Sequence, residues 1–198
     1  SDVLILNRGN ASGHSTNDGE IVQRRSTDSG TSFGARSEIT STPGGVRAPS
    51  ILDVPGDDRI ILWYKEEDSN GNLVGVRSIY TDDSGNTWSS PTNLTNNGTF
   101  ESGVTNSFSG GGIETSQGLV NGANASTEKV QIAFSTDNGS TWGNTVDVVD
   151  NSNYTEAHTE ACLCRVSDNN DEVLIVGREI SDRDNEKFWA STSSDGGV

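Results

Sequence analysis

The sequence is poor in several residue types that mark particular classes of protein. Its 198 residues include two cysteines, two histidines, four prolines and no methionine, and 30% of them are hydrophobic. The hydrophobic residues occur in short clusters, so we expect an ordered chain without a transmembrane segment. No stretch of residues 1–198 reads as a signal peptide.

Positive charge is also scarce. The chain has 13 basic and 29 acidic residues and a formal net charge of −16. Broad binding of nucleic acid needs a basic stripe, and docking on an anionic membrane needs a basic face, so we expect neither partner. Basic residues that gather in a cleft of such a protein would stand out electrostatically.

The two cysteines, Cys162 and Cys164, lie two residues apart in a segment that reads as a strand. Their side chains therefore share one face, and a disulfide between them would be strained. We expect two free, buried thiols. With no histidine or second cysteine pair nearby they make a poor metal site, and the acidic run 182–186 lacks calcium-ligand spacing. We expect no metal and no cofactor.

The most informative feature that is present is one short pattern in four copies. The pattern is Ser/Thr-x-Asp-x-Gly-x-x-aromatic, and its aspartates, Asp28, Asp83, Asp137 and Asp195, are 55, 54 and 58 residues apart. We call the copies boxes 1 to 4; they cover residues 26–33, 81–88, 135–142 and 193–197, the last without its aromatic residue. A turn repeated at this interval predicts an array of similar supersecondary units.

Each residue of the box has a structural explanation. An aspartate in a tight turn accepts hydrogen bonds from the backbone N–H groups just after it. The glycine takes a backbone conformation that side chains disfavour, and the aromatic residue buries a large apolar face. The boxes therefore predict scaffold turns and not catalytic groups.

Between the boxes the sequence reads as short strands, and no stretch has sustained helical periodicity. The expected strands cover residues 3–6, 20–24, 48–54, 59–65, 75–80, 112–115, 118–121, 129–134, 161–166, 172–177 and 187–191. Three strands, a box and a fourth strand in each repeat are typical of a four-stranded β-propeller blade. We therefore expect an all-β fold, a single partial propeller domain with blades at about 1–45, 46–98, 99–150 and 151–198. That amounts to about three and a half blades, so a further segment or a second chain would complete the ring.

The sequence between the boxes resembles the exo-α-sialidase (neuraminidase) family, whose propeller has six blades. The resemblance covers nearly the whole chain. Its segments, in order, are Leu6-Asn7-Arg8, Arg24-Arg25-Ser26-Thr27-Asp28, Arg47-Ala48-Pro49, Gly110-Gly111-Gly112-Ile113-Glu114, Thr159-Glu160-Ala161-Cys162 and Val176-Gly177-Arg178.

The resemblance implies a retaining glycoside hydrolase that removes terminal sialic acid from glycoconjugates. Sialic acid carries a carboxylate at its anomeric carbon, which arginine binds well and which would repel a carboxylate nucleophile. The family instead uses a tyrosine activated by a glutamate, with an aspartate as general acid and base. By position, Glu160 is the partner of the tyrosine and Asp18 is the acid and base. Arg178 is a carboxylate-binding arginine, and Arg8 and Arg47 are further substrate-binding residues.

The chain departs from the family pattern at several positions. Counting back from Arg24 without gaps places Ser15, and not Asp18, at the acid/base position. Arg47 stands where the family has asparagine. The family's first arginine would precede residue 1, and its third arginine and its tyrosine would follow residue 198. We therefore expect this chain to hold only part of the site.

A second register remains open. Arg47-Ala48-Pro49 can be read as the Arg-Ile-Pro segment of the family, which moves the acid and base to Asp68. We favour the first register, because the second leaves the match around residues 8–28 to chance. It also places Glu160 and Arg178 one blade too early.

The expected partner is a sialylated or other glycan, and the expected location is extracellular or secreted. Two other functions remain open. One is a non-catalytic propeller of the same turn type that binds carbohydrate or protein. The other is a different glycan-cleaving enzyme on the same scaffold, because a fold alone does not fix an activity.

Overall fold

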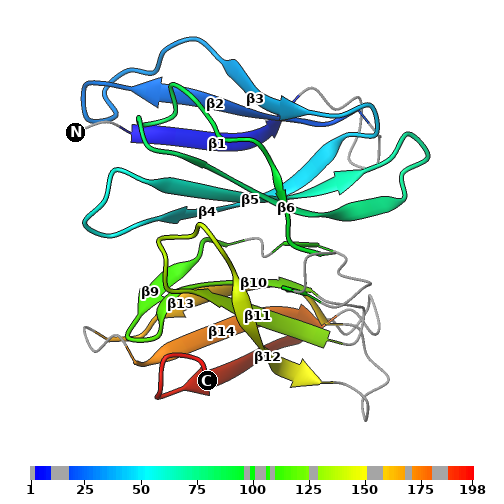
Figure 1. Cartoon of the computed structure of the whole chain (residues 1–198), viewed down its shortest axis with the longest axis vertical. Helices are drawn as coiled ribbons and strands as arrows, with labels where there is room; N and C mark the ends of the chain where they lie inside the picture. The colour runs from blue at the N-terminus through cyan, green and yellow to red at the C-terminus, as the bar shows by residue number, and fades with distance from the viewer. Residues whose placement is uncertain are drawn as a thin grey trace.

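In the computed structural model, every regular element of the described residues is a β-strand (Figure 1). The described residues are 3–9, 18–95, 99–100, 106–107, 110–124, 129–150, 158–167, 171–179 and 187–198. Within these ranges no helix is long and apolar enough to cross a membrane. The expected all-β class is confirmed.

Two antiparallel sheets form the first half of the chain. Sheet 1 has the order β1-β2-β3, with β1 at Val3–Gly9, β2 at Glu20–Ser26 and β3 at Ser37–Ser41. Sheet 2 has the order β4-β5-β6-β7, with strands Val46–Asp53, Ile60–Glu67, Leu73–Thr81 and Thr92–Asn93. Chain order therefore equals spatial order in both sheets.

Two more sheets form the second half. Sheet 3 has the order β12-β11-β10-β8, with β9 also paired to β10. Its strands β8 to β12 are Asn106–Ser107, Ile113–Thr115, Gly118–Asn124, Lys129–Ser135 and Gly143–Asp150. Sheet 4 has the order β13-β14-β15, with strands His158–Arg165, Val173–Glu179 and Lys187–Ser193.

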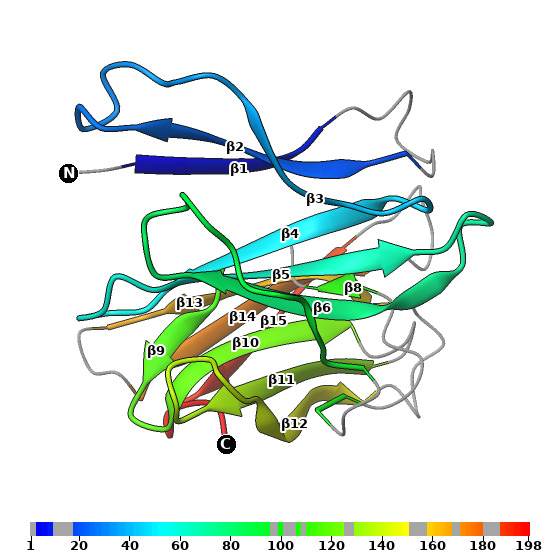
Figure 2. The same cartoon turned by 45° about the horizontal axis from the view of Figure 1, so that its top comes forward.

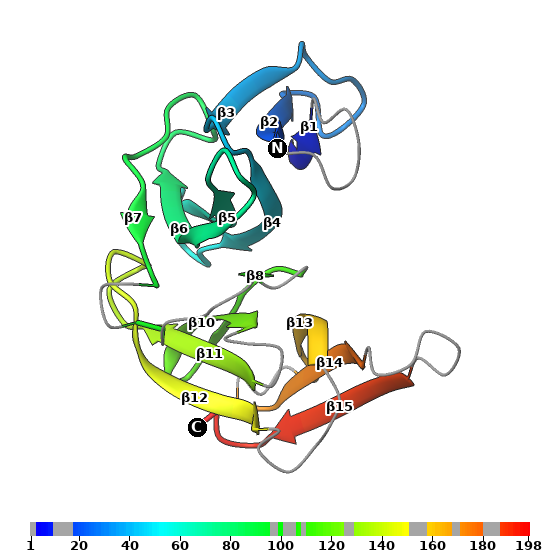
Figure 3. The ribbon, with the colours of Figure 1, turned by 90° about the vertical axis from the view of Figure 1, so that its right-hand side faces the viewer.

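The four sheets follow one another around an arc (Figures 2 and 3). In Figure 3 the strands β1, β4, β8 and β13 lie on the concave side, and β3, β7, β12 and β15 lie on the convex side. This radial arrangement of small antiparallel sheets is that of a β-propeller. Residues far apart in sequence therefore share the concave side.

The core is divided into three clusters, one between each pair of neighbouring sheets. The cluster between sheets 1 and 2 contains Ile21, Leu62 and Tyr64. Between sheets 2 and 3, Trp63 and Trp142 pack edge to face with ring centroids 4.6 Å apart. A third cluster joins sheets 3 and 4; its buried members are Val120, Val130, Ile132, Phe134, Ala161, Leu163, Val173 and Ile175. Each sheet is thus held mainly by its neighbours.

Each box forms the hydrogen-bonded turn that the sequence predicts. In box 3, Asp137 Oδ1 accepts hydrogen bonds from the Thr141 N–H at 2.8 Å and the Ser135 hydroxyl at 2.8 Å. Its Oδ2 accepts from the Thr141 hydroxyl at 2.6 Å, and the Gly139 N–H donates to Ser135 Oγ at 2.8 Å. The same bonds recur in boxes 1 and 2. The boxes follow the carboxyl ends of β2, β6, β11 and β15, so they share one end of the fold.

The cysteines differ in part from the expectation. Both Cys162 and Cys164 are free, as expected, but both are exposed. The neighbouring Ala161 and Leu163 are buried in the cluster between sheets 3 and 4. Because side chains alternate along a strand, the cysteines take the opposite face of β13. The expectation of buried thiols was therefore wrong.

Candidate functional site at the bulge end

The predicted site residues gather at the end of the sheets opposite the boxes. Arg8 lies at the carboxyl end of β1 and Asp18 lies just before β2. Arg47 and Glu160 lie near the amino ends of β4 and β13, and Arg178 lies near the carboxyl end of β14. Antiparallel pairing places all of these strand ends on one side. We call this side the bulge end and the other the box end. Figure 3 looks onto the bulge end.

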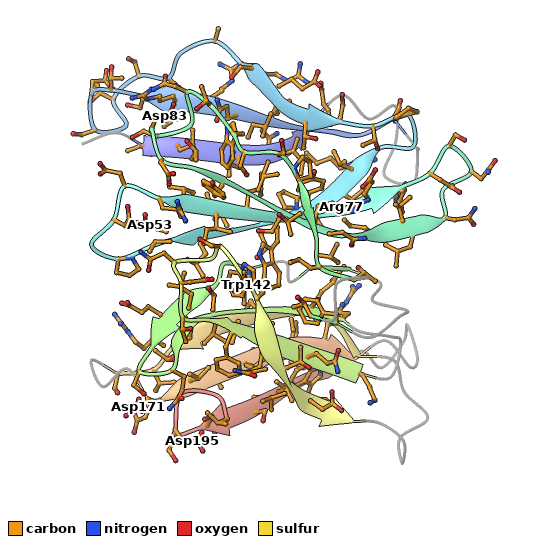
Figure 4. All side chains as sticks on the ribbon, in the orientation of Figure 1. Asp53, Arg77, Asp83, Trp142, Asp171 and Asp195 are labelled. Atoms are coloured by element: carbon orange, nitrogen blue, oxygen red, sulfur yellow. The ribbon has the colours of Figure 1, made fainter. Side chains whose placement is uncertain are left out.

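Figure 4 separates the two ends by labelled residues. The box aspartates Asp83 and Asp195 lie at one end of the sheets, together with Asp53 and Asp171. Arg77, on β6, lies toward the other end. The repeated turns and the predicted chemistry thus occupy opposite ends of the same strands.

Two β-bulges shape the concave side at the bulge end. In β4 the register with β5 shifts between Arg47 and Ser50, and Ala48 has a φ of 49°. In β13 the register with β14 shifts between Thr159 and Cys162, and Glu160 has a φ of 52°. A positive φ also occurs in boxes 1 to 3, at Ser29, Ser84 and Asn138. The two bulges, which are frequent next to active sites, therefore distinguish this end, and the φ values do not.

Glu160 and Arg178 form an ion pair across β13 and β14. Arg178 Nη2 lies 3.0 Å from Glu160 Oε2, and the Glu160 side chain is 50% exposed. The bulge places Glu160 out of the regular register, so its carboxylate meets the arginine that pairs with Thr159 on the neighbouring strand. The structure therefore brings together two of the five predicted residues.

Arg47 belongs to a second charged group on β4 and β5. Its Nε lies 2.6 Å from Glu67 Oε2, and Lys65 Nζ lies 2.8 Å from Glu67 Oε1. The Glu67 side chain is 4% exposed, so burial of this carboxylate depends on its two cations. Arg47 therefore has a structural role in addition to its predicted contact with substrate.

Arg8 packs against the start of β2. A side-chain carbon built on Gly19 would lie 2.5 Å from Arg8 Nε and 2.7 Å from the Val46 carbonyl oxygen. Glycine at residue 19 thus lets the guanidinium of β1 approach the backbone of β4. Asp18, the predicted acid and base, is exposed directly beside this contact.

Asp68, the acid and base of the second register, has a different task. Its Oδ1 accepts hydrogen bonds from the N–H groups of Asn70 and Asn72, both at 2.8 Å. Its Oδ2 accepts one from the Asn72 side chain at 3.0 Å. The side chain and N–H of Asn72 lower the pKa of Asp68, which is unfavourable for a general acid. Its geometry is that of a turn-forming aspartate. Ser15, the other alternative, lies outside the described residues.

The sequence interpretation missed Lys65 and Glu67. They follow Trp63 and Tyr64 in a run of charged residues that reads as a solvated strand end and turn. Alternation along β5 places Trp63, Lys65 and Glu67 on one face, and Trp63 is fully buried. That period of two, counted from the tryptophan, was the only available signal that Glu67 turns inward.

One cavity among the described residues lies at the box end. It has a volume of about 510 Å³ and is lined by box 3 and β12 residues, including Trp142, Asn144 and Val146. Because the five predicted site residues and the two bulges lie at the opposite end, we place the candidate site there. In the part of the chain that the structure describes, no group of three or more His, Cys, Asp or Glu side chains could hold a metal ion.

Comparison with known proteins identifies the fold. No family model and no curated protein sequence matches the chain. Among solved structures, a protein of unknown function from Dyadobacter fermentans has a TM-score of 0.77 at 17% identity, over 99% of this chain and 63% of that one. A Hadza microbial sialidase has a TM-score of 0.74 at 19% identity, covering 99% and 42% of the two chains. An α-L-arabinanase from Penicillium chrysogenum has a TM-score of 0.66 at 15% identity, covering 98% and 60%.

The chain has the fold of the sialidase and arabinanase β-propellers. It spans 42 to 63% of the length of these three structures. The propeller predicted from the sequence is therefore confirmed. At such low sequence identities the structural similarity establishes the fold alone. The activity has to be inferred from the chemistry of the site.

Proposed function

We propose that this chain is part of a retaining glycoside hydrolase that releases terminal sialic acid from glycoconjugates at the bulge end. The observation that carries the proposal is the Glu160–Arg178 ion pair of 3.0 Å beside the β13 bulge. The resemblance assigns Arg178 to the substrate carboxylate and Glu160 to the tyrosine, and the two side chains meet in the fold. The propeller fold shared with sialidases supports the same reading.

The pair fits the chemistry of a sugar that carries a carboxylate. Arg178 offers a fixed fork of N–H donors to the substrate carboxylate. Glu160, half exposed beside it, accepts the proton of a tyrosine nucleophile as that tyrosine attacks the anomeric carbon. The ion pair with Arg178 holds the carboxylate of Glu160 in one orientation, as a positioned base requires.

The remaining predicted residues complete one wall of the site in this proposal. Asp18 protonates the leaving oxygen and then activates water, while Arg8 and Arg47 contact the sugar. Arg8 lies against Gly19, next to Asp18, so these two groups come from one corner of sheet 1. The tyrosine and the other carboxylate-binding arginines would come from outside this chain.

The direct test is turnover of a fluorogenic sialoside by the full-length parent protein. We expect Glu160→Gln to lower kcat/KM by a factor of about one hundred or more, because glutamine cannot accept the tyrosine proton. Glu172→Gln, an exposed position at the box end, is the matched control and should retain activity. Absence of turnover by the unaltered parent would contradict the proposal.

A second candidate function is cleavage of a neutral glycan. The structural likeness to an α-L-arabinanase favours including it. Such an enzyme needs no arginine for a substrate carboxylate, so Arg178→Gln would leave its activity nearly unchanged. A parent protein that cleaves arabinan and ignores sialosides would establish this alternative.

A further inference from the structure

Sheets 2 and 4 place charged residues at equivalent positions beside their bulges. In sheet 2 the last pair before the bulge is Arg47 with Lys65, and in sheet 4 it is Thr159 with Arg178. Lys65 is therefore the counterpart of Arg178, and the strained Ala48 is the counterpart of Glu160. Figure 3 shows β4 and β13 both on the concave side. The two cations thus stand at the same level of the propeller, two blades apart.

The two positions differ in what holds the cation. In sheet 4 the partly exposed Glu160 pairs with Arg178. In sheet 2 alanine replaces that glutamate, and the buried Glu67 instead holds Lys65 and Arg47, one cation on each carboxylate oxygen. Taken together, these three side chains carry a net positive charge. Their cationic side chains remain 20% and 18% exposed, for Arg47 and Lys65 respectively.

Such a cluster is unusual in this chain. With 29 acidic and 13 basic residues, its average field repels anions. An anionic glycan gains most from the few places where two cations share one buried counter-charge. A buried carboxylate also fixes the two cations in position, which lowers the cost of ordering them around a ligand.

We propose that Arg47 and Lys65, positioned by Glu67, form a second anion subsite, and that the preferred substrates are glycans with two acidic groups. The terminal acid sugar lies at Arg178, and a second carboxylate or a sulfate on the same glycan lies at Lys65 and Arg47. This inference rests on the proposed function for the first of the two acids. It adds a role for Lys65 and Glu67 that the resemblance does not supply.

The test is the affinity of the full chain for three glycans, measured by titration calorimetry: sialyllactose, a sulfated sialyllactose and disialyllactose. We expect the two doubly acidic glycans to bind roughly fivefold tighter than sialyllactose, as one partly exposed ion pair allows. The preference should shrink as salt is raised, because exposed charges are screened. Comparing the sulfated glycan with the disialylated one shows whether the second subsite prefers a sulfate or a carboxylate.

Variants test whether the preference for doubly acidic glycans comes from the cluster of Arg47, Lys65 and Glu67. Lys65→Gln should bring the affinity ratio close to one, and Lys65→Arg should restore it because the charge returns. Lys129→Gln is the matched control, since Lys129 forms a similar ion pair with Asp147 on the outer strands at 3.1 Å. It should leave the ratio unchanged. Unfolding midpoints of all variants show that each remains folded.

The outcomes separate this inference from the proposed function. A wild-type ratio of one, or a ratio that survives Lys65→Gln, overturns the second subsite while sialyllactose binding upholds the first. If no glycan binds, the same titration is made with inorganic sulfate. Binding that Lys65→Gln abolishes then supports the anion subsite and counts against sialic acid as the substrate. Absence of sulfate binding overturns the subsite.

Discussion

The box end and the bulge end of this propeller are built from the same strands but follow different rules. At the box end, boxes 1 to 3 repeat the same four hydrogen bonds to an aspartate and a hydroxyl side chain. At the bulge end, equivalent positions of sheets 2 and 4 carry different residues, Ala48 and Glu160. The box end thus repeats the same hydrogen bonds from sheet to sheet, whereas the residues at the bulge end differ between sheets.

The box end also joins neighbouring sheets. The Gln23 side chain of sheet 1 donates to the Gly85 carbonyl of box 2 at 2.6 Å and accepts from Trp88 Nε1 at 3.2 Å. Arg59, which immediately precedes β5 of sheet 2, donates to the Asn138 carbonyl of box 3 at 3.2 Å. Each of these boxes is therefore fixed to the preceding sheet. Stability should depend on the box end and specificity on the bulge end.

Gly139 offers the strongest way to break the box end. Its φ is 77°, and an added side-chain carbon would lie within 2.0 Å of Ile61 Cδ1 in the core. Gly139→Ala should lower the free energy of unfolding by about 2 kcal/mol, through backbone strain together with overpacking. Chemical denaturation measures the loss. Gly143→Ala is the control, because nothing lies within 4 Å of its added carbon. Equal losses of stability in the two variants would show that the turn of box 3 is no more important for stability than the position of Gly143.

Acid should weaken the box end selectively. Hydrogen bonds, led by those from Ser26 and from the Thr87 N–H respectively, lower the pKa values of Asp28 and Asp83 from 3.8 to about 2. A carboxyl group whose pKa is lower in the folded than in the unfolded protein stabilises the fold at pH values above its unfolded pKa. That contribution is lost as the pH falls from about 4 to about 2. The stability difference between wild type and Asp83→Asn should therefore shrink over this range. A difference that stays constant with pH would contradict the assignment.

The sequence predicted the scaffold better than the site. Box residues act through neighbours four positions away or fewer, so local chemistry was sufficient to predict them. The repeat predicts a fourth strand after each box, but its residues after box 3 were not located. Val146 and Val148 of β12, at Gly143–Asp150, nevertheless alternate with Thr145 and Asp147 as in a half-buried strand. The first residues of this strand, Gly143, Asn144 and Thr145, have no large apolar side chain, so the alternation covers only its second half.

The bulges could not be predicted in the same way. A bulge is a property of two paired strands, and Ala48 and Glu160 carry no local mark of it. The resemblance nevertheless placed Glu160 and Arg178 in the site, and the fold brings them within 3.0 Å. Glu67 escaped notice because its burial depends on cations from two strands, Arg47 and Lys65.

The smallest predicted effect concerns the strain in the bulge of sheet 2. Ala48 holds a φ of 49°, which costs an L-residue about 1 kcal/mol, and glycine adopts it freely. Ala48→Gly should therefore raise the free energy of unfolding by somewhat less than about 1 kcal/mol, since glycine also gains entropy in the unfolded chain. Ala35→Gly, at an exposed loop position without a positive φ, should lower it by up to about 1 kcal/mol. Opposite signs in urea denaturation would show that the bulge is strained by its backbone, whereas equal losses would show that Ala48 is relaxed there.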